Sequence, residues 1–164
     1  MAPSNNPEYE PIIIPISHSG AYLYQAPHQL KLTLDKQLAV VFCLKNSSSA
    51  GLVLSSPELS IKDLLSELEL LHLKIKSKLN IHTSDIYLKI FGLSHGATNV
   101  LESVHHWANS LSISVNVTEV GRRLIRNVII DCRTGKVEIT YGDLLAQHSN
   151  LIFLTEGTAR NRIP

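Results

Sequence analysis

Residues 113–141 restrict the fold more than any other part of the chain, because they contain three runs with the two-residue period of β-strands. Valine or isoleucine recurs at every second position in residues 115–118, 128–131 and 137–140. Gly135 separates the last two runs, and glycine readily takes the positive φ that tight turns need. We therefore predict an antiparallel hairpin in which residues 125–131 pair with residues 136–141.

The pattern of the amino-terminal third of the chain predicts further strands, separated by turn residues. Leu38–Leu44 is an unbroken apolar run, which is typical of a strand covered on both faces. We predict that Val40 and Phe42 face one side of this strand and that Val41 and Cys43 face the other. The other strand-like runs here are residues 12–16, 21–24, 30–34 and 51–54. We expect residues 51–54 to pair with Leu38–Leu44 in a hairpin, across a serine loop at residues 46–50.

Two segments have the spacing of amphipathic helices. In Ile61–Leu79 apolar residues recur every three or four positions, Ser60 and Asp63 have capping-box spacing, and Asn80 is a natural stop. Residues 100–111 form the second pattern, with Asn99 and Glu102 as its cap, and a strand at residues 86–91 separates the helices. The predicted fold is therefore α/β (α+β), a mixed β-sandwich-like sheet core flanked by two helices.

Composition limits the classes of partner. The chain has 164 residues, 44% hydrophobic and 18% charged, with a formal net charge of +1. Such a balance gives no broad attraction to nucleic acid or anionic membranes, so a partner must be recognised locally. No apolar run approaches the roughly 20 residues of a membrane helix, and the first residues do not resemble a secretory signal. We expect a cytoplasmic protein with no membrane span.

Cysteine spacing argues against metal or disulfide chemistry. Cys43 and Cys132 lie in apolar strand-like runs and form no CxxC pair, so buried reduced thiols are expected. The sequence predicts neither a metal site nor a cofactor. On length the chain is one domain, which we place at residues 12–142, after a flexible arm at 1–11 and before an extension at 143–164 with a strand-like run at 151–155.

A series of short motifs in residues 89–136 occurs in the order and spacing of one family. In sequence order they are the strand KIFG, Gly96, Asn99 with Val100, the strand ISVNVTE, Gly121, Arg126 and the turn TGKV. The series resembles the CheD chemoreceptor glutamine deamidases, a branch of the cysteine-hydrolase fold that includes the catalytic domains of cytotoxic necrotizing factors. The resemblance implies a protein partner, a chemoreceptor or a CheC-type protein, with Gly96, Asn99, Gly121 and Arg126 as partner-binding positions.

The positions that would carry the family's chemistry are changed. The resemblance implies a thiolate nucleophile, a histidine base and a threonine that orients the base. Thr33 stands where the threonine belongs, but Ala39 replaces the nucleophile and the histidine position falls near Val53 or Leu54. We therefore expect a catalytically inactive homologue that binds a protein partner. The alternative is an active amidohydrolase with Cys43 as a displaced nucleophile.

Overall fold

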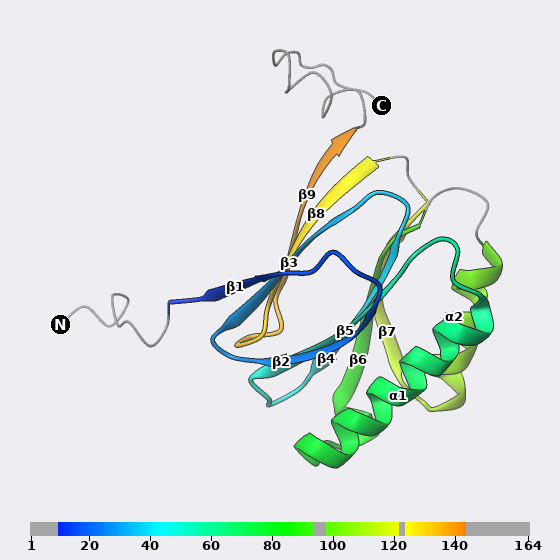
Figure 1. Cartoon of the computed structure of the whole chain (residues 1–164). Helices are drawn as coiled ribbons and strands as arrows, with labels where there is room; N and C mark the ends of the chain where they lie inside the picture. The colour runs from blue at the N-terminus through cyan, green and yellow to red at the C-terminus, as the bar shows by residue number, and fades with distance from the viewer. Residues whose placement is uncertain (1–9, 94–97, 122–123, 144–164) are drawn as a thin grey trace.

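The computed structural model describes residues 10–93, 98–121 and 124–143, which form two β-sheets and two helices (Figure 1). The first part of the chain holds β1 (Ile12–Pro15), β2 (Gly20–Gln25), β3 (His28–Leu34), β4 (Leu38–Leu44) and β5 (Ser49–Ser55). It continues with α1 (Ile61–Leu79), the short 3₁₀ helix η3 (Thr83–Asp85), β6 (Ile86–Gly92), α2 (Thr98–Ser110), β7 (Ser114–Val120), β8 (Leu124–Asp131) and β9 (Val137–Asp143).

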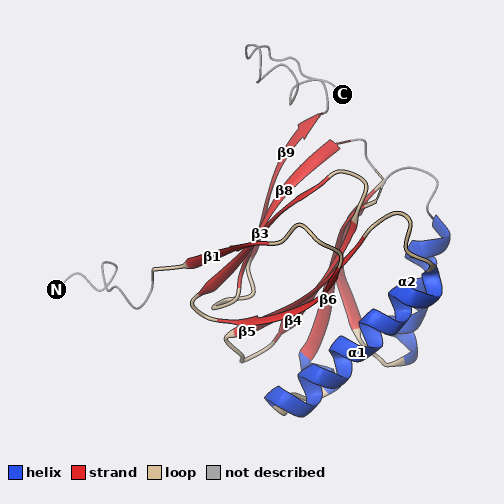
Figure 2. Cartoon of the chain, in the orientation of Figure 1, coloured by secondary structure: helices blue, strands red, loops and turns tan. Residues whose placement is uncertain are grey.

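Both sheets are mixed. One has the strand order β1-β3-β8-β9 and the other the order β2-β5-β4-β6-β7. Within them β1 pairs parallel with β3, β6 pairs parallel with β7, and the other neighbours are antiparallel. Both helices lie on the same side of the five-stranded sheet, and the four-stranded sheet lies on its other side (Figure 2). The predicted sandwich flanked by two helices is confirmed.

The predicted central strand is also confirmed. β4 is the middle strand of the five-stranded sheet, and all seven of its residues are buried. Val40 and Phe42 belong to the core beneath the helices, whereas Val41 and Cys43 belong to the core between the sheets. A strand covered on both faces has no polar face to expose, which explains its unbroken apolar sequence.

Helix α1 has the predicted bounds because both of its ends are capped by local chemistry. Ser60 Oγ accepts a hydrogen bond from the Asp63 N–H at 3.1 Å, and Asn80 ends the helix with a left-handed φ of 54°. Gly51 on β5 makes room for the helix, because a Cβ there would lie 3.1–3.3 Å from side-chain atoms of Leu71, Phe42 and Ile75. The buried stripe of the helix is Leu64, Leu68, Leu71, His72 and Ile75.

Helix α2 differs from the prediction at both ends. It already includes Thr98, so Asn99 lies within its first turn and the prediction that Asn99 caps the helix is wrong. At the other end, Ser112 takes a φ of 60° and the Ile113 N–H donates to the Ala108 carbonyl at 2.8 Å. This bond closes a Schellman turn, which ends the helix at Ser110 rather than at Leu111.

The hairpin that defines the carboxyl-terminal part is confirmed. β8 and β9 pair antiparallel, and Gly135 has a φ of 77° in the turn between them. β5 begins at Ser49, so the serine loop is shorter than predicted, because Ala50 pairs with Cys43 and Ser49 pairs with Gln25. The strand-like run at 151–155, most of the predicted arm and the extension beyond Asp143 lie outside the described residues.

Candidate functional site

Thr33 and Ala39, two of the positions implied by the resemblance, lie on opposite sides of a sheet. Thr33 is exposed on the outer face of β3, where its hydroxyl donates to Asn127 Oδ1 at 3.0 Å. Ala39 is fully buried in the core between the two sheets. The structure therefore does not bring these two side chains together.

The surroundings of Ala39 are apolar. Its partners in the neighbouring strands are Leu54 on β5 and Phe91 on β6, and both belong to the same buried core. Of the two positions predicted for the histidine, Leu54 lies beside Ala39 in this core, and Val53 belongs to the other core, beneath the helices. None of these three side chains can accept a proton, so neither strand neighbour of Ala39 supplies a base.

Cys43 lies on the same face of β4 as Ala39 and is fully buried. Burial raises the pKa of its thiol, and the nearby charge of Lys89 and a hydrogen bond with Tyr87 only partly oppose this rise. Its Sγ donates a long hydrogen bond, 3.9 Å, to the Gly135 carbonyl. A buried thiol with a raised pKa is a poor nucleophile at neutral pH.

Cys132 is buried and free as well. Burial and the charge of Asp131 raise its pKa to about 11, and a hydrogen bond with the backbone of Ala50 acts in the other direction. Both cysteines therefore behave as small core residues, as the sequence predicted.

The positions that the resemblance assigns to partner binding differ in their exposure. Asn99 is exposed on α2, while Gly121 turns the chain after β7 with a φ of 83° and donates its N–H to the Leu93 carbonyl at 2.9 Å. Arg126 is fully buried, and its Nε donates to Glu119 Oε1 at 2.6 Å. A side chain with no exposed surface cannot contact a partner directly. Gly96 lies outside the described residues.

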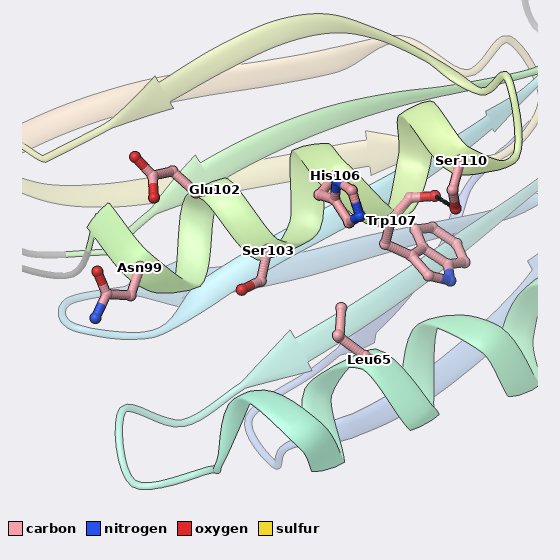
Figure 3. Close-up of a pocket in the computed structure, with 7 residues that line it drawn as sticks. All are labelled: Leu65, Asn99, Glu102, Ser103, His106, Trp107 and Ser110. Atoms are coloured by element: carbon pink, nitrogen blue, oxygen red, sulfur yellow. Dashed lines mark hydrogen bonds between the residues drawn. The ribbon is translucent and has the colours of Figure 1, made fainter.

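A surface groove of about 470 Å³ lies between the two helices. Its volume is within the range of ligand and peptide sites. Leu65 points from α1 toward α2, and the indole of Trp107 and the hydroxyl of Ser103 point from α2 toward α1 (Figure 3). The residues that line the groove are Leu65 on α1 and Asn99, Glu102, Ser103, His106, Trp107 and Ser110 on α2.

Trp107 is held in place from several directions. Its Nε1 donates to Glu69 Oε1 at 3.1 Å, and its ring meets those of Phe42 and His72 edge to face at centroid distances of 6.2 and 6.0 Å. Such contacts favour one orientation of the indole. The groove therefore has a fixed aromatic wall that is only half-buried.

His72 supports this wall from beneath. The side chain is buried, its Nε2 lies 3.3 Å from Thr83 Oγ1, and its Nδ1 has no hydrogen-bond partner among the residues that the structure describes. Burial lowers the pKa of His72, although the nearby Glu69 carboxylate acts to raise it. Burial thus favours the neutral ring beneath Trp107.

The apolar surface continues onto the outer face of α1. Leu70 and Leu73 are 63% and 52% exposed, which is unusual for two leucines one turn apart on a helix. Leu73 follows Glu69 by four residues and so lies one turn further along the same side of α1. Sequence reasoning missed this site, although Leu70 and Leu73 fall outside the apolar stripe that it assigned to α1.

Residues 10–93, 98–121 and 124–143 hold no group of three or more His, Cys, Asp or Glu side chains arranged to bind a metal ion. In the same part of the chain, neither helix combines the length and the apolar character that crossing a membrane requires.

Comparison with known proteins gives little. No family model matches the chain. No curated protein matches it either. Among solved structures, the chain is similar to Neisseria meningitidis protein NMB0706, described as family DUF152, with a TM-score of 0.42 and 10% sequence identity. The match covers 76% of this chain and 64% of that one. A likeness this weak carries no functional argument.

Proposed function

We propose that this protein has no catalytic activity and binds a protein partner through its helix layer. The observation that carries the proposal is the groove between α1 and α2, with the half-buried Trp107 as one wall. Exposed apolar surface of this kind, extended here by Leu70 and Leu73, commonly marks a protein interaction site.

The absence of catalysis is inferred from Ala39 and Cys43. A cysteine hydrolase needs a thiolate and a base within hydrogen-bond reach. Here the position of the nucleophile is an alanine among Leu54 and Phe91, and the thiol on the same face of β4 is buried with a raised pKa. The burial of Cys43 therefore disfavours the alternative of an active deamidase with a displaced nucleophile.

The kind of partner is taken from the resemblance to the CheD family. We propose a cytoplasmic chemotaxis or signalling role, with a chemoreceptor or a CheC-type protein as partner. The support is the series of motifs in residues 89–136, of which Asn99 also lines the groove.

Photo-crosslinking tests the binding surface. A benzoylphenylalanine placed at Ser103 should form adducts with a protein partner in the cells that express the chain. The same probe at Lys31, exposed on the outer face of β3, is the matched control and should give no adduct of that size. Equal adducts from both positions, or none from Ser103, would contradict the proposed surface.

A second experiment tests the absence of catalysis. We expect no release of ammonia from glutamine peptides or chemoreceptor fragments by the wild-type protein or by Cys43→Ala. Release that disappears in Cys43→Ala would overturn the proposal. Alkylation supplies an independent readout: iodoacetamide should modify Cys43 slowly at neutral pH in the folded protein and at the rate of a free thiol in urea.

A further inference from the structure

We infer that the groove between α1 and α2 binds an amphipathic segment of the partner that carries one lysine or arginine among apolar residues. The inference rests on the proposed function and adds the chemistry of the occupant.

The apolar part of the argument comes from Leu65 and Trp107. Leu65 extends from α1 toward α2, and the indole of Trp107 extends from α2 toward α1, further along the groove (Figure 3). Because Trp107 is fixed by Glu69, Phe42 and His72, little side-chain freedom is lost when a partner covers it. Apolar side chains at helical spacing would fit such a groove.

The charge of the groove favours a cation. Glu69 places a carboxylate against the indole, and Glu102 is exposed at the rim, directed away from α1 (Figure 3). None of the groove-lining side chains described is Lys or Arg, so this region is acidic in a chain whose net charge is +1. An indole face also attracts cations, Arg more often than Lys.

The lysines of α1 limit the number of cations to one. Lys62 precedes Leu65 by three residues and Lys76 follows Leu73 by three, so each lies one turn beyond the apolar positions and is exposed. A polybasic segment would meet these like charges on α1. Among the described residues, the acidic side chains that a single cation could approach are Glu69, beside the indole, and Glu102, at the rim.

Selection of peptides tests the inference. Random twelve-residue peptides displayed on phage are panned against the full chain, and enriched peptides are synthesised and titrated while the fluorescence of Trp107, the only tryptophan, is followed. We expect enriched peptides with one Lys or Arg flanked by apolar residues. Glu102→Lys should weaken their binding about tenfold or more, whereas Glu138→Lys, on the outer face of β9, should leave it unchanged.

Steric variants separate this inference from the proposed function. Ser103→Arg fills the groove, and Asn109→Arg places the same side chain elsewhere on the exposed surface of α2. Thermal unfolding confirms that each variant folds. Enriched peptides that bind the wild-type protein and Asn109→Arg but not Ser103→Arg occupy the groove. If such peptides contain no Lys or Arg, the charge inference is overturned and the proposed function stays intact. If no enriched peptide is sensitive to Ser103→Arg, both fail. A synthetic peptide of residues 144–164 is titrated against the protein in the same way. If it binds the groove as tightly as the enriched peptides, the occupant is a segment of this chain, and the assignment of a separate partner is overturned.

Discussion

Gly92, the last residue of β6, should be one of the least replaceable residues in the chain. It has a φ of 99°, a conformation that L-residues rarely adopt. A Cβ at this position would overlap the carbonyl oxygen of Gln37, which is a backbone atom and cannot rotate away. The same oxygen accepts the Leu93 N–H at 2.8 Å, so moving it would also strain that hydrogen bond.

The cost of Gly92→Ala can be divided into two contributions. A left-handed conformation costs a residue with a Cβ about 1–2 kcal/mol. Weakening the bond between Leu93 and Gln37 adds about 0.5–1.5 kcal/mol. We therefore expect the free energy of unfolding to fall by about 1.5–3.5 kcal/mol.

Gly135→Ala is the matched control, because Gly135 also has a positive φ, 77°, but among the described residues no atom beyond its two chain neighbours lies within 4 Å of where its Cβ would be. Only the conformational cost of about 1–2 kcal/mol applies there. The entropy that alanine removes from the unfolded chain is common to both variants and cancels in the comparison. Urea unfolding followed by circular dichroism gives the two free energies. Equal losses in the two variants would refute the steric argument at Gly92.

Three further predictions concern the core and the ion pair. Because burial lowers the pKa of His72, the unfolded chain binds its proton more readily, so stability present above about pH 6.5 should fall as the pH drops below it. His72→Gln should reduce the difference between urea midpoints at pH 7.5 and 5.5, and an unchanged difference would exclude His72 as the cause. Glu119→Gln removes the carboxylate charge beside the buried Arg126 and should lower the free energy of unfolding by about 1–3 kcal/mol. This is less than the loss for a fully buried pair, because the Glu119 side chain is 22% exposed. Glu138→Gln, in an exposed pair with Lys136, should change stability by less than about 1 kcal/mol, and similar losses in the two glutamine variants would count against a structural role for the buried pair. Gly51→Val should cost about 1–3 kcal/mol in the same unfolding assay by pressing on Leu71 and Phe42, and wild-type stability would mean that α1 moves away freely.

The elements with strong local signals could be predicted from the sequence. Leu38–Leu44 and Ile61–Leu79 have the predicted bounds, because an unbroken apolar run and a capped amphipathic pattern each define their own limits. The pairing of the strands could not be predicted in the same way. Nothing in the β1 pattern specifies that it pairs parallel with β3, since such pairing depends on contacts between distant residues.

At Thr33 and Arg126, the roles that the family resemblance implies disagree with the directions that the two-residue period of a strand gives their side chains. Thr33 stands between Leu32 and Leu34, which are buried, so the two-residue period alone places its hydroxyl on the outer face. Arg126 shares its side of β8 with Val128 and Ile130, and the same period predicts that it points inward. The groove had no comparable signal, because it depends on the distance between two helices.

The two faces of β4 take part in different regions of the molecule, the core between the sheets and the wall of the groove. Ala39, Val41 and Cys43 fill the space between the sheets, where a nucleophile would need access to substrate and a base. On the opposite face of the same strand, Phe42 packs against Trp107 and so supports the wall of the groove. An apolar β4 therefore closes one potential site while it stabilises the other. If the helix layer binds a partner as proposed, that binding depends on Phe42 through its contact with Trp107, whereas Ala39 lies on the opposite face of β4 and does not contribute to it.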